Sequence, residues 1–235
     1  NRQVLYIDCN GDTVIPGFHD AHIHLDGMAN FVASVDCSFD NAGSISAIQS
    51  LISQRARDTP SGHWIRARGY HEMNLADGRH PTRYDLDLCS PSNPVKLTHQ
   101  SGHASVLNSF ALALIGISEE TRDLPGSVIE RLPNSDVPSG LLIEMEGWLS
   151  QQIPQISENE WAGGIRHAKD TLVSQGVTSF QDATATNESS HWLKFRTLVD
   201  SIGPPLRATV MMGEGGVKDF DSHKNSHGGQ NPTGN

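Results

Sequence analysis

The chain has 235 residues, of which 36% are hydrophobic and 19% charged, enough for a globular protein with a sizeable core. Its formal net charge of −10 argues against nucleic acids and anionic membranes as partners, because both require a basic surface. No apolar run is long enough to span a bilayer. Three widely separated cysteines without a CxxC pair predict reduced thiols and a cytoplasmic protein.

In the first half of the chain, predicted strands alternate with a helix. Residues 14–25 are apolar and compatible with a strand. Residues 44–58 place isoleucines and leucine on one helical face, with Ser44 suited to be the N-cap. Residues 63–70 and 95–100 alternate in the manner of strands.

The second half continues this pattern. Ser157 and Glu160 form a predicted capping box at the start of a helix, and Gly176 ends that helix. A strand, a helix and a second strand are then predicted at 177–182, 192–199 and 206–212. Strands that alternate with helices predict parallel βαβ units and an α/β fold class. The final residues 213–235, rich in Gly, Asn, Ser and His, predict a loop or a disordered end.

The segment PGFHDAHIHLDG at Pro16–Gly27 concentrates histidine and aspartate near the end of the first predicted strand. Alternation along a strand puts Asp20, His22 and His24 on one face and His19 on the other, with apolar neighbours. A buried face of this polar kind needs a partner, and two imidazoles at i and i+2 can reach one metal ion. The alternative is a pair of surface histidines, since HxH also occurs by chance.

Five blocks of the chain together resemble the amidohydrolase superfamily, and in particular its amidohydrolase-3 branch of YtcJ-like proteins and N-substituted formamide deformylases. The blocks are VIPGFHDAHIHLDG, PTRYDLD, PVKLTHQSGHASVLNS, SGLLIEME and GVTSFQDA, in this order. The first resembles the signature that ends the first barrel strand in that superfamily. The similarity covers most of residues 14–212.

The resemblance implies a metal-dependent hydrolase on a TIM-like (β/α)8 barrel, which acts on an amide-type or formamide-type C–N bond of a small-molecule substrate. His22 and His24 match the first two metal ligands, and one or two divalent ions, zinc above all, would activate water. Glu144 is a candidate further ligand, with a solvated glutamate as the alternative. The family's general base is an aspartate expected beyond the end of this chain.

The resemblance also suggests the roles of other residues. His103, Tyr70 and His71 are candidate substrate-binding residues, although His103 could equally bond to its own loop. Glu72 follows Tyr70 and His71 in the loop where the family places substrate-facing residues. Asp20 and Asp182 are candidates to orient a ligand imidazole or the strand, and Asp182 could instead cap a helix. No partner is identifiable from sequence for a further set of histidines: His63, His80, His99, His167 and His191. The spacing of His223 and His227 suits a helix, but the residues around them favour a loop.

The expected organisation is an incomplete barrel. Residues 1–13 are expected to be the remnant of a β-sandwich, 14–212 a partial barrel and 213–235 the loop or disordered end. About five or six strands are predicted, whereas a closed barrel needs eight. We therefore expect a piece of a longer protein that is inactive by itself. The resemblance allows a homo-oligomer, but no interface is visible in the sequence.

Two other functions stay open at this point. One is a deaminase of the same superfamily, acting on an aminated heterocycle. The other is a non-catalytic remnant that binds a metal or a small molecule.

Overall fold

A computed structural model describes residues 6–184, 187–188, 206–213 and 216–217. The helix predicted at 192–199 and most of the predicted loop at 213–235 lie outside these residues. The described chain divides into two compact units. The first combines Asn1–Met28 with Ile165–Asn235, and the second is Ala29–Gly164.

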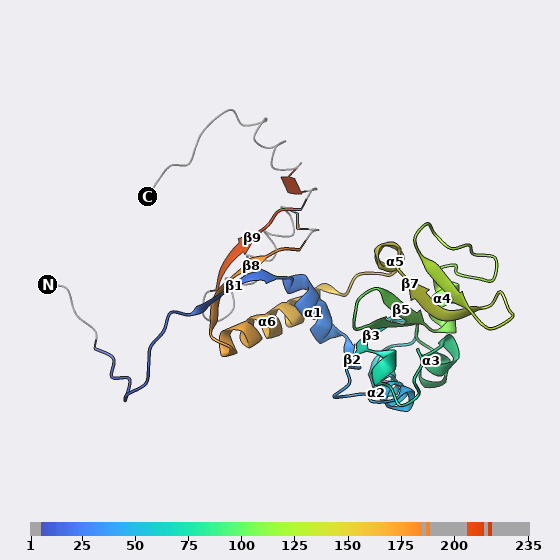
Figure 1. The fold of residues 1–235 in the computed structure, drawn as a ribbon, viewed down its shortest axis with the longest axis horizontal. Coiled ribbons are helices and arrows are strands. Elements are labelled where there is room, and N and C mark those ends of the chain that lie inside the picture. Colours follow the sequence, from blue (N-terminus) through green and yellow to red (C-terminus); the bar gives the residue numbers. More distant parts are fainter. Residues whose placement is uncertain (1–5, 185–186, 189–205, 214–215, 218–235) are drawn as a thin grey trace. The chain divides into compact units, whose positions relative to one another are not determined.

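The first unit contains a three-stranded parallel sheet of order β1-β8-β9 (Figure 1). Its strands are β1 (Phe18–Ile23), β8 (Val177–Asp182) and β9 (Arg207–Val210). Two helices cross the boundary between the units: α1 (Leu25–Ala33) and α6 (Glu158–Ser174). The predicted strand at 177–182 is confirmed without a shift at either end.

The second unit is built on a six-stranded mixed sheet of order β2-β3-β4-β5-β7-β6 (Figure 1). Its strands are β2 (Val35–Asp36), β3 (Ile65–Tyr70), β4 (Val95–His99), β5 (Ala104–Leu107), β6 (Val128–Arg131) and β7 (Pro138–Ile143). Its helices are α2 (Ile45–Asp58), α3 (Arg83–Cys89), α4 (Ser109–Leu114) and α5 (Glu146–Gln152), with the 3-10 helix η1 (Glu72–Asn74) after β3.

The α/β class is confirmed, but the expectation of purely parallel pairing is wrong for part of the second sheet. Strands β2, β3 and β4 are parallel, whereas β4–β5, β5–β7 and β6–β7 are antiparallel. The turn between His99 and Ala104 is too short for a crossover helix, so β5 must return beside β4. Within the described residues the strands form two sheets and not one closed barrel, and residues 6–13 contain no strand.

The capping signals read from the sequence are present. The hydroxyl of Ser44 accepts the backbone N–H of Ala47 at 3.2 Å, which starts α2. At α6, the carboxylate of Glu160 accepts the backbone N–H of Ser157 at 2.9 Å. Gly176 then adopts a φ of +78°, the left-handed conformation that ends a helix at little cost for glycine.

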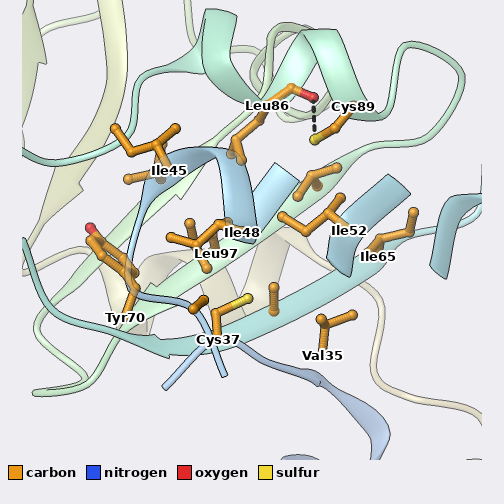
Figure 2. Packing of buried hydrophobic residues seen from close by; sticks show 14 of the residues in the cluster. Val35, Cys37, Ile45, Ile48, Ile52, Ile65, Tyr70, Leu86, Cys89 and Leu97 are labelled. Atoms are coloured by element: carbon orange, nitrogen blue, oxygen red, sulfur yellow. Dashed lines mark hydrogen bonds between the residues drawn. The ribbon is translucent and has the colours of Figure 1, made fainter. Parts of the chain in front are cut away.

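The core of the second unit lies between its helices and its sheet (Figure 2). Helix α2 packs against α3 and β3. It contributes Ile45, Ile48 and Ile52, all at most 4% exposed. Two buried cysteines join this core, and all three cysteines, Cys9, Cys37 and Cys89, are free. Among the described residues, the structure contains no helix long and apolar enough to cross a membrane.

Candidate functional site

The HxH motif lies at the carboxyl end of β1, next to β8. In the parallel register Asp20 faces Phe180 and Ile23 faces Asp182. Of the face predicted to be apolar, Ile23 is buried but Ala21 is exposed. On the other face His22 and His24 are exposed, so the expectation of a buried polar face is wrong. His19, expected to face a helix layer, is exposed, and its Nδ1 lies 2.9 Å from the hydroxyl of Ser179 on β8.

The two imidazoles of the motif are neighbours. The ring centroids of His22 and His24 are 5.0 Å apart and the rings stand at 89° to each other. Nδ1 of His24 lies 3.4 Å from the hydroxyl of Thr184. If that nitrogen carries the proton and donates to Thr184, the Nε2 lone pair of His24 is left for a metal ion.

Asp20 and Asp182 fix the backbone around these histidines. Asp20 accepts the N–H of His22 at 3.1 Å. Asp182 accepts the N–H of Leu25, the first residue of α1, at 3.0 Å, and that of Thr184 at 2.8 Å. Its backbone partners are thus the residue after His24 and a residue just beyond the end of β8.

The carboxylate of Asp182 is stabilised by uncharged donors. Burial by itself raises the pKa of Asp182, but hydrogen bonds from Thr184, Leu25 and Asn187 lower it below its usual value. The carboxylate therefore stays charged at neutral pH, and the strand end and the helix start remain tied together.

In the second unit, Glu144 and His103 pair with each other. Nδ1 of His103 lies 3.1 Å from the nearer carboxylate oxygen of Glu144, and both side chains are more than half exposed. The backbone N–H of Glu144 donates to the carbonyl of His103 at 2.8 Å, and Glu144 has a φ of +56°. The pair thus follows directly from the strand ends of β5 and β7, and as an exposed ion pair it contributes little to stability.

A second and denser cluster lies where β3 and β4 end. The parallel register places Tyr70 beside His99, and η1 begins directly after β3. His71, Glu72 and His99 each offer one ligand atom within 4.8 Å of the others. The ring of His71 lies 4.7 Å from that of His99 between centroids.

The Glu72 carboxylate is the centre of this cluster. Its Oε2 lies 3.0 Å from Nε2 of His99, 3.5 Å from Nδ1 of His71 and 3.7 Å from Nε2 of His80. The other ring nitrogen of His80 lies 2.9 Å from the hydroxyl of the fully buried Tyr70. We call this set, His71, Glu72, His80 and His99 with Tyr70, the β3–β4 cluster.

Burial and charge shift the titration of the cluster. Burial raises the pKa of Glu72, but a backbone N–H and the three imidazoles lower it overall. Burial lowers the pKa of His99, and the opposing effect of Glu72 does not restore it. Burial also raises the pKa of the Tyr70 hydroxyl well above its usual range. At neutral pH the cluster therefore holds a carboxylate, a neutral His99 and a protonated phenol.

Comparison with known proteins identifies the family. The sequence model of the amidohydrolase family matches residues 6–233. The chain belongs to the amidohydrolase family. The N-substituted formamide deformylase of Arthrobacter pascens is 36% identical over 78% of the chain and 35% of its own length. The amidohydrolase YtcJ of Bacillus subtilis (strain 168) is 28% identical over 92% of the chain and 39% of its own length.

Two solved structures share the fold of this amidohydrolase chain. Both are described as uncharacterized metal-dependent hydrolases, one from Pyrococcus horikoshii OT3 and one from Pyrococcus furiosus. The first has a TM-score of 0.62 at 18% identity and the second 0.60 at 19%, each over 88% of this chain. The chain covers 38% and 40% of their lengths. It thus spans well under half of the proteins it resembles.

Sequence reasoning brought out Tyr70, His71 and Glu72 but missed His80 and His99. No partner of these two histidines was identifiable from the sequence, and the structure shows that both contact Glu72. A signal was present in the sequence: His71 and Glu72 directly follow the predicted strand 63–70, and His99 lies near the end of the predicted strand 95–100. Neighbouring parallel strands end at the same sheet edge. The remaining predicted histidine pair, His223 and His227, lies outside the described residues.

Proposed function

We propose that the complete protein is a metal-dependent hydrolase that cleaves an amide-type C–N bond of a small molecule. The observation that carries the proposal is the pair of adjacent imidazoles, His22 and His24, at the carboxyl end of a parallel strand. Catalytic groups of parallel α/β folds gather at this end of the strands. Membership of the amidohydrolase family supports the reaction class.

The residues at this strand end suit a metal of the zinc class. Two exposed imidazoles are ligands that such an ion prefers, and Thr184 can hold the ring of His24 in the tautomer that leaves Nε2 free. When bound, one or two divalent ions would lower the pKa of a water molecule and polarise a carbonyl. Asp20 and Asp182 keep the backbone on both sides of His22 and His24 in place.

The substrate is proposed from the relatives and from the strand ends of the second unit. The name of the Arthrobacter relative points to N-substituted formamides, and we extend this chemical class to the present protein. In the complete protein we propose a TIM-like barrel, with His71 and His103 as substrate-binding residues. Tyr70, predicted for the same role, is fully buried and cannot contact a substrate directly. We keep Glu144 as a candidate ligand, which would have to exchange its contact with His103 for the metal.

Metal analysis of the full-length protein tests the proposal. The double variant His22→Ala/His24→Ala should lose at least one equivalent of zinc and the hydrolysis of N-formyl and N-acyl amines. His19→Ala is the matched control, since His19 is an exposed histidine of the same motif whose ring pairs with Ser179. An unchanged zinc content in the double variant would contradict the proposal. Release of ammonia from aminated heterocycles, with no amide hydrolysis, would favour the deaminase instead.

A further inference from the structure

We propose that His71, Glu72 and His99 form a second divalent-metal site, composed only of residues of the second unit. This site goes beyond the proposed hydrolytic function, which depends on His22 and His24. It also involves residues for which the sequence suggested substrate binding or no role at all.

The spacing of the donor atoms suits one ion. Oε2 of Glu72 lies 3.0 Å from Nε2 of His99 and 3.5 Å from Nδ1 of His71. That Nδ1 accepts the backbone N–H of Met73 at 3.2 Å, a bond that a metal ion would replace. A tetrahedral zinc ion with bonds of about 2.0–2.2 Å holds its ligand atoms roughly 3.3–3.6 Å apart. Only small side-chain rotations would therefore bring the three atoms around a common centre.

Two of these atoms are buried and have no hydrogen bond. Oε2 of Glu72 and Nε2 of His99 are both inaccessible, and the 3.0 Å contact between them lacks the geometry of a hydrogen bond. The His99 side chain is only 10% exposed. An unsatisfied buried carboxylate oxygen costs on the order of 1–3 kcal/mol or more, so a native protein rarely retains one. A cation between the two atoms would satisfy both.

The surroundings of His99 provide for the change of proton position that metal binding needs. Its Nδ1 accepts the backbone N–H of Ser101 at 3.1 Å, so without metal the proton of the neutral ring is on Nε2. The hydroxyl of Ser101 lies 2.8 Å from the same Nδ1 and can accept a proton from it. Metal binding at Nε2 would place the ring proton on Nδ1, which would give up the bond from the Ser101 backbone N–H and donate to the Ser101 hydroxyl instead.

His80 lies beside the three ligands and would have to move closer to become a fourth donor. Its Nε2 lies 3.7 Å from Oε2 of Glu72, while its Nδ1 lies 2.9 Å from the hydroxyl of Tyr70. A ligating histidine is usually oriented by a hydrogen bond at its other ring nitrogen. Tyr70, fully buried in the core, holds His80 in this way.

The donor set selects the class of ion. Imidazoles with one carboxylate suit Zn²⁺ or Co²⁺, whereas Mg²⁺ and Ca²⁺ favour sites made of oxygen atoms. Glu72 contributes the only negative charge among the three proposed ligands, and it balances half of the charge of the ion. The histidine side chains at the rim, His71 and His80, are about one-third exposed, so an ion can reach the site from solvent.

Zinc binding to the full-length protein tests the site, with His22→Asn/His24→Asn as the background so that the proposed hydrolytic site is removed. That background should bind about one equivalent of zinc. Adding Glu72→Gln should weaken this binding by about tenfold or more, since even the loss of a group that only orients a ligand costs about 10–100-fold. His99→Gln should have a similar effect. Glu119→Gln and His63→Gln, at exposed residues of the same unit, are the matched controls.

The two proposals fail separately. Zinc lost on replacing His22 and His24 reports on the hydrolytic site, whereas zinc lost on replacing Glu72 in that background reports on the second site. Equal zinc affinity of the Glu72→Gln and Glu119→Gln proteins, or no binding at all by the background variant, would overturn the second site.

Nitrogen NMR of the His99 ring gives an independent readout. Zinc should move the ring proton from Nε2 to Nδ1, and an unchanged tautomer would also overturn the site.

Discussion

The two units of this chain expose chemistry at strand ends in different ways. In the first unit, His22 and His24 are close because they are close in sequence, and both are exposed at the end of a three-stranded sheet. In the second unit, Glu72 and His99 meet because β3 and β4 are neighbours, and two of their polar atoms are buried without a hydrogen bond. A site built from one strand is visible in the sequence, whereas a site built from two strands depends on the pairing.

The units also differ in what holds their functional residues in place. A buried carboxylate, Asp182, with uncharged donors ties together the strand end of the first unit. The second unit relies on an extensive apolar core and on a charged pair, Arg79 with Asp85, that caps α3. Substitutions in the two units should therefore change the unfolding free energy by different amounts and with different dependence on pH and salt.

The largest effect is expected from Gly140→Ala in β7 of the second unit. Gly140 has a φ of +107°, and an added Cβ would lie 2.7 Å from the backbone N of Arg83 and from the carbonyl O of Leu107. Because backbone atoms cannot yield as a side chain does, we expect a loss of about 3–5 kcal/mol in unfolding free energy by denaturant titration.

Gly62→Ala is the control for this substitution. Gly62 also has a positive φ, +80°, but nothing lies within 4 Å of the added Cβ. Only the conformational cost of about 1–2 kcal/mol should remain. Equal losses in the two variants would show that the close approach of the backbone at Gly140 has no energetic consequence.

Asp182→Asn should destabilise the first unit by about 1–3 kcal/mol at neutral pH, because the second oxygen accepts a hydrogen bond that an amide nitrogen cannot accept. The folded-state pKa of Asp182 lies below its usual value. Its stabilisation is therefore complete above the unfolded pKa of about 3.9 and is lost as the pH falls through the folded pKa. Denaturant titrations between neutral and acidic pH measure this.

The control for this pH dependence is Asp170→Asn, at an exposed residue of α6 in the same unit. Its stability difference from the unsubstituted protein should be small at every pH. A difference for Asp182→Asn that stays constant down to about pH 2 would contradict the assigned role of the carboxylate.

The smallest effect, about 1 kcal/mol, is expected from Asp85→Asn in the second unit. The Asp85 carboxylate accepts bonds from Arg79 at 2.8 and 3.1 Å and from the N–H of Thr82 at 2.7 Å, which outweigh burial and lower its pKa. Since Arg79 is half exposed, roughly 1 M salt should remove part of the effect. The stability loss caused by Asp182→Asn should not change with salt, because the hydrogen-bond donors to Asp182 are uncharged. If salt reduced the stability losses of both variants equally, the proposed difference between the two carboxylates would be contradicted.

The sequence predicted those elements whose ends carry their own signals. Ser44, Ser157 and Gly176 mark helix ends through contacts within a few residues, and the predicted ends agree closely with α2 and α6. The antiparallel strands β5, β6 and β7 were not all foreseen, because four-residue segments such as Val128–Arg131 are too short for a periodic pattern. Their pairing depends on contacts with distant residues.

For the sites, the same distinction holds. Strand alternation was enough to bring His22 and His24 together, because His22 lies in β1 and His24 directly follows the last residue of that strand. No local pattern could bring Glu72 to His99 or orient His80, since these contacts require the register of β3 on β4 and the turn of η1. The pairing of Glu144 with His103 likewise follows from the β5–β7 pairing.

Anomalous diffraction at the zinc edge, from crystals of the full-length protein grown with zinc, tests the central claim most directly. The account predicts a peak within about 2.0–2.1 Å of a ring nitrogen of both His22 and His24. A second peak is predicted between Glu72 and His99. Zinc bound elsewhere, with no peak at His22 and His24, would contradict the metal-dependent function proposed for this chain.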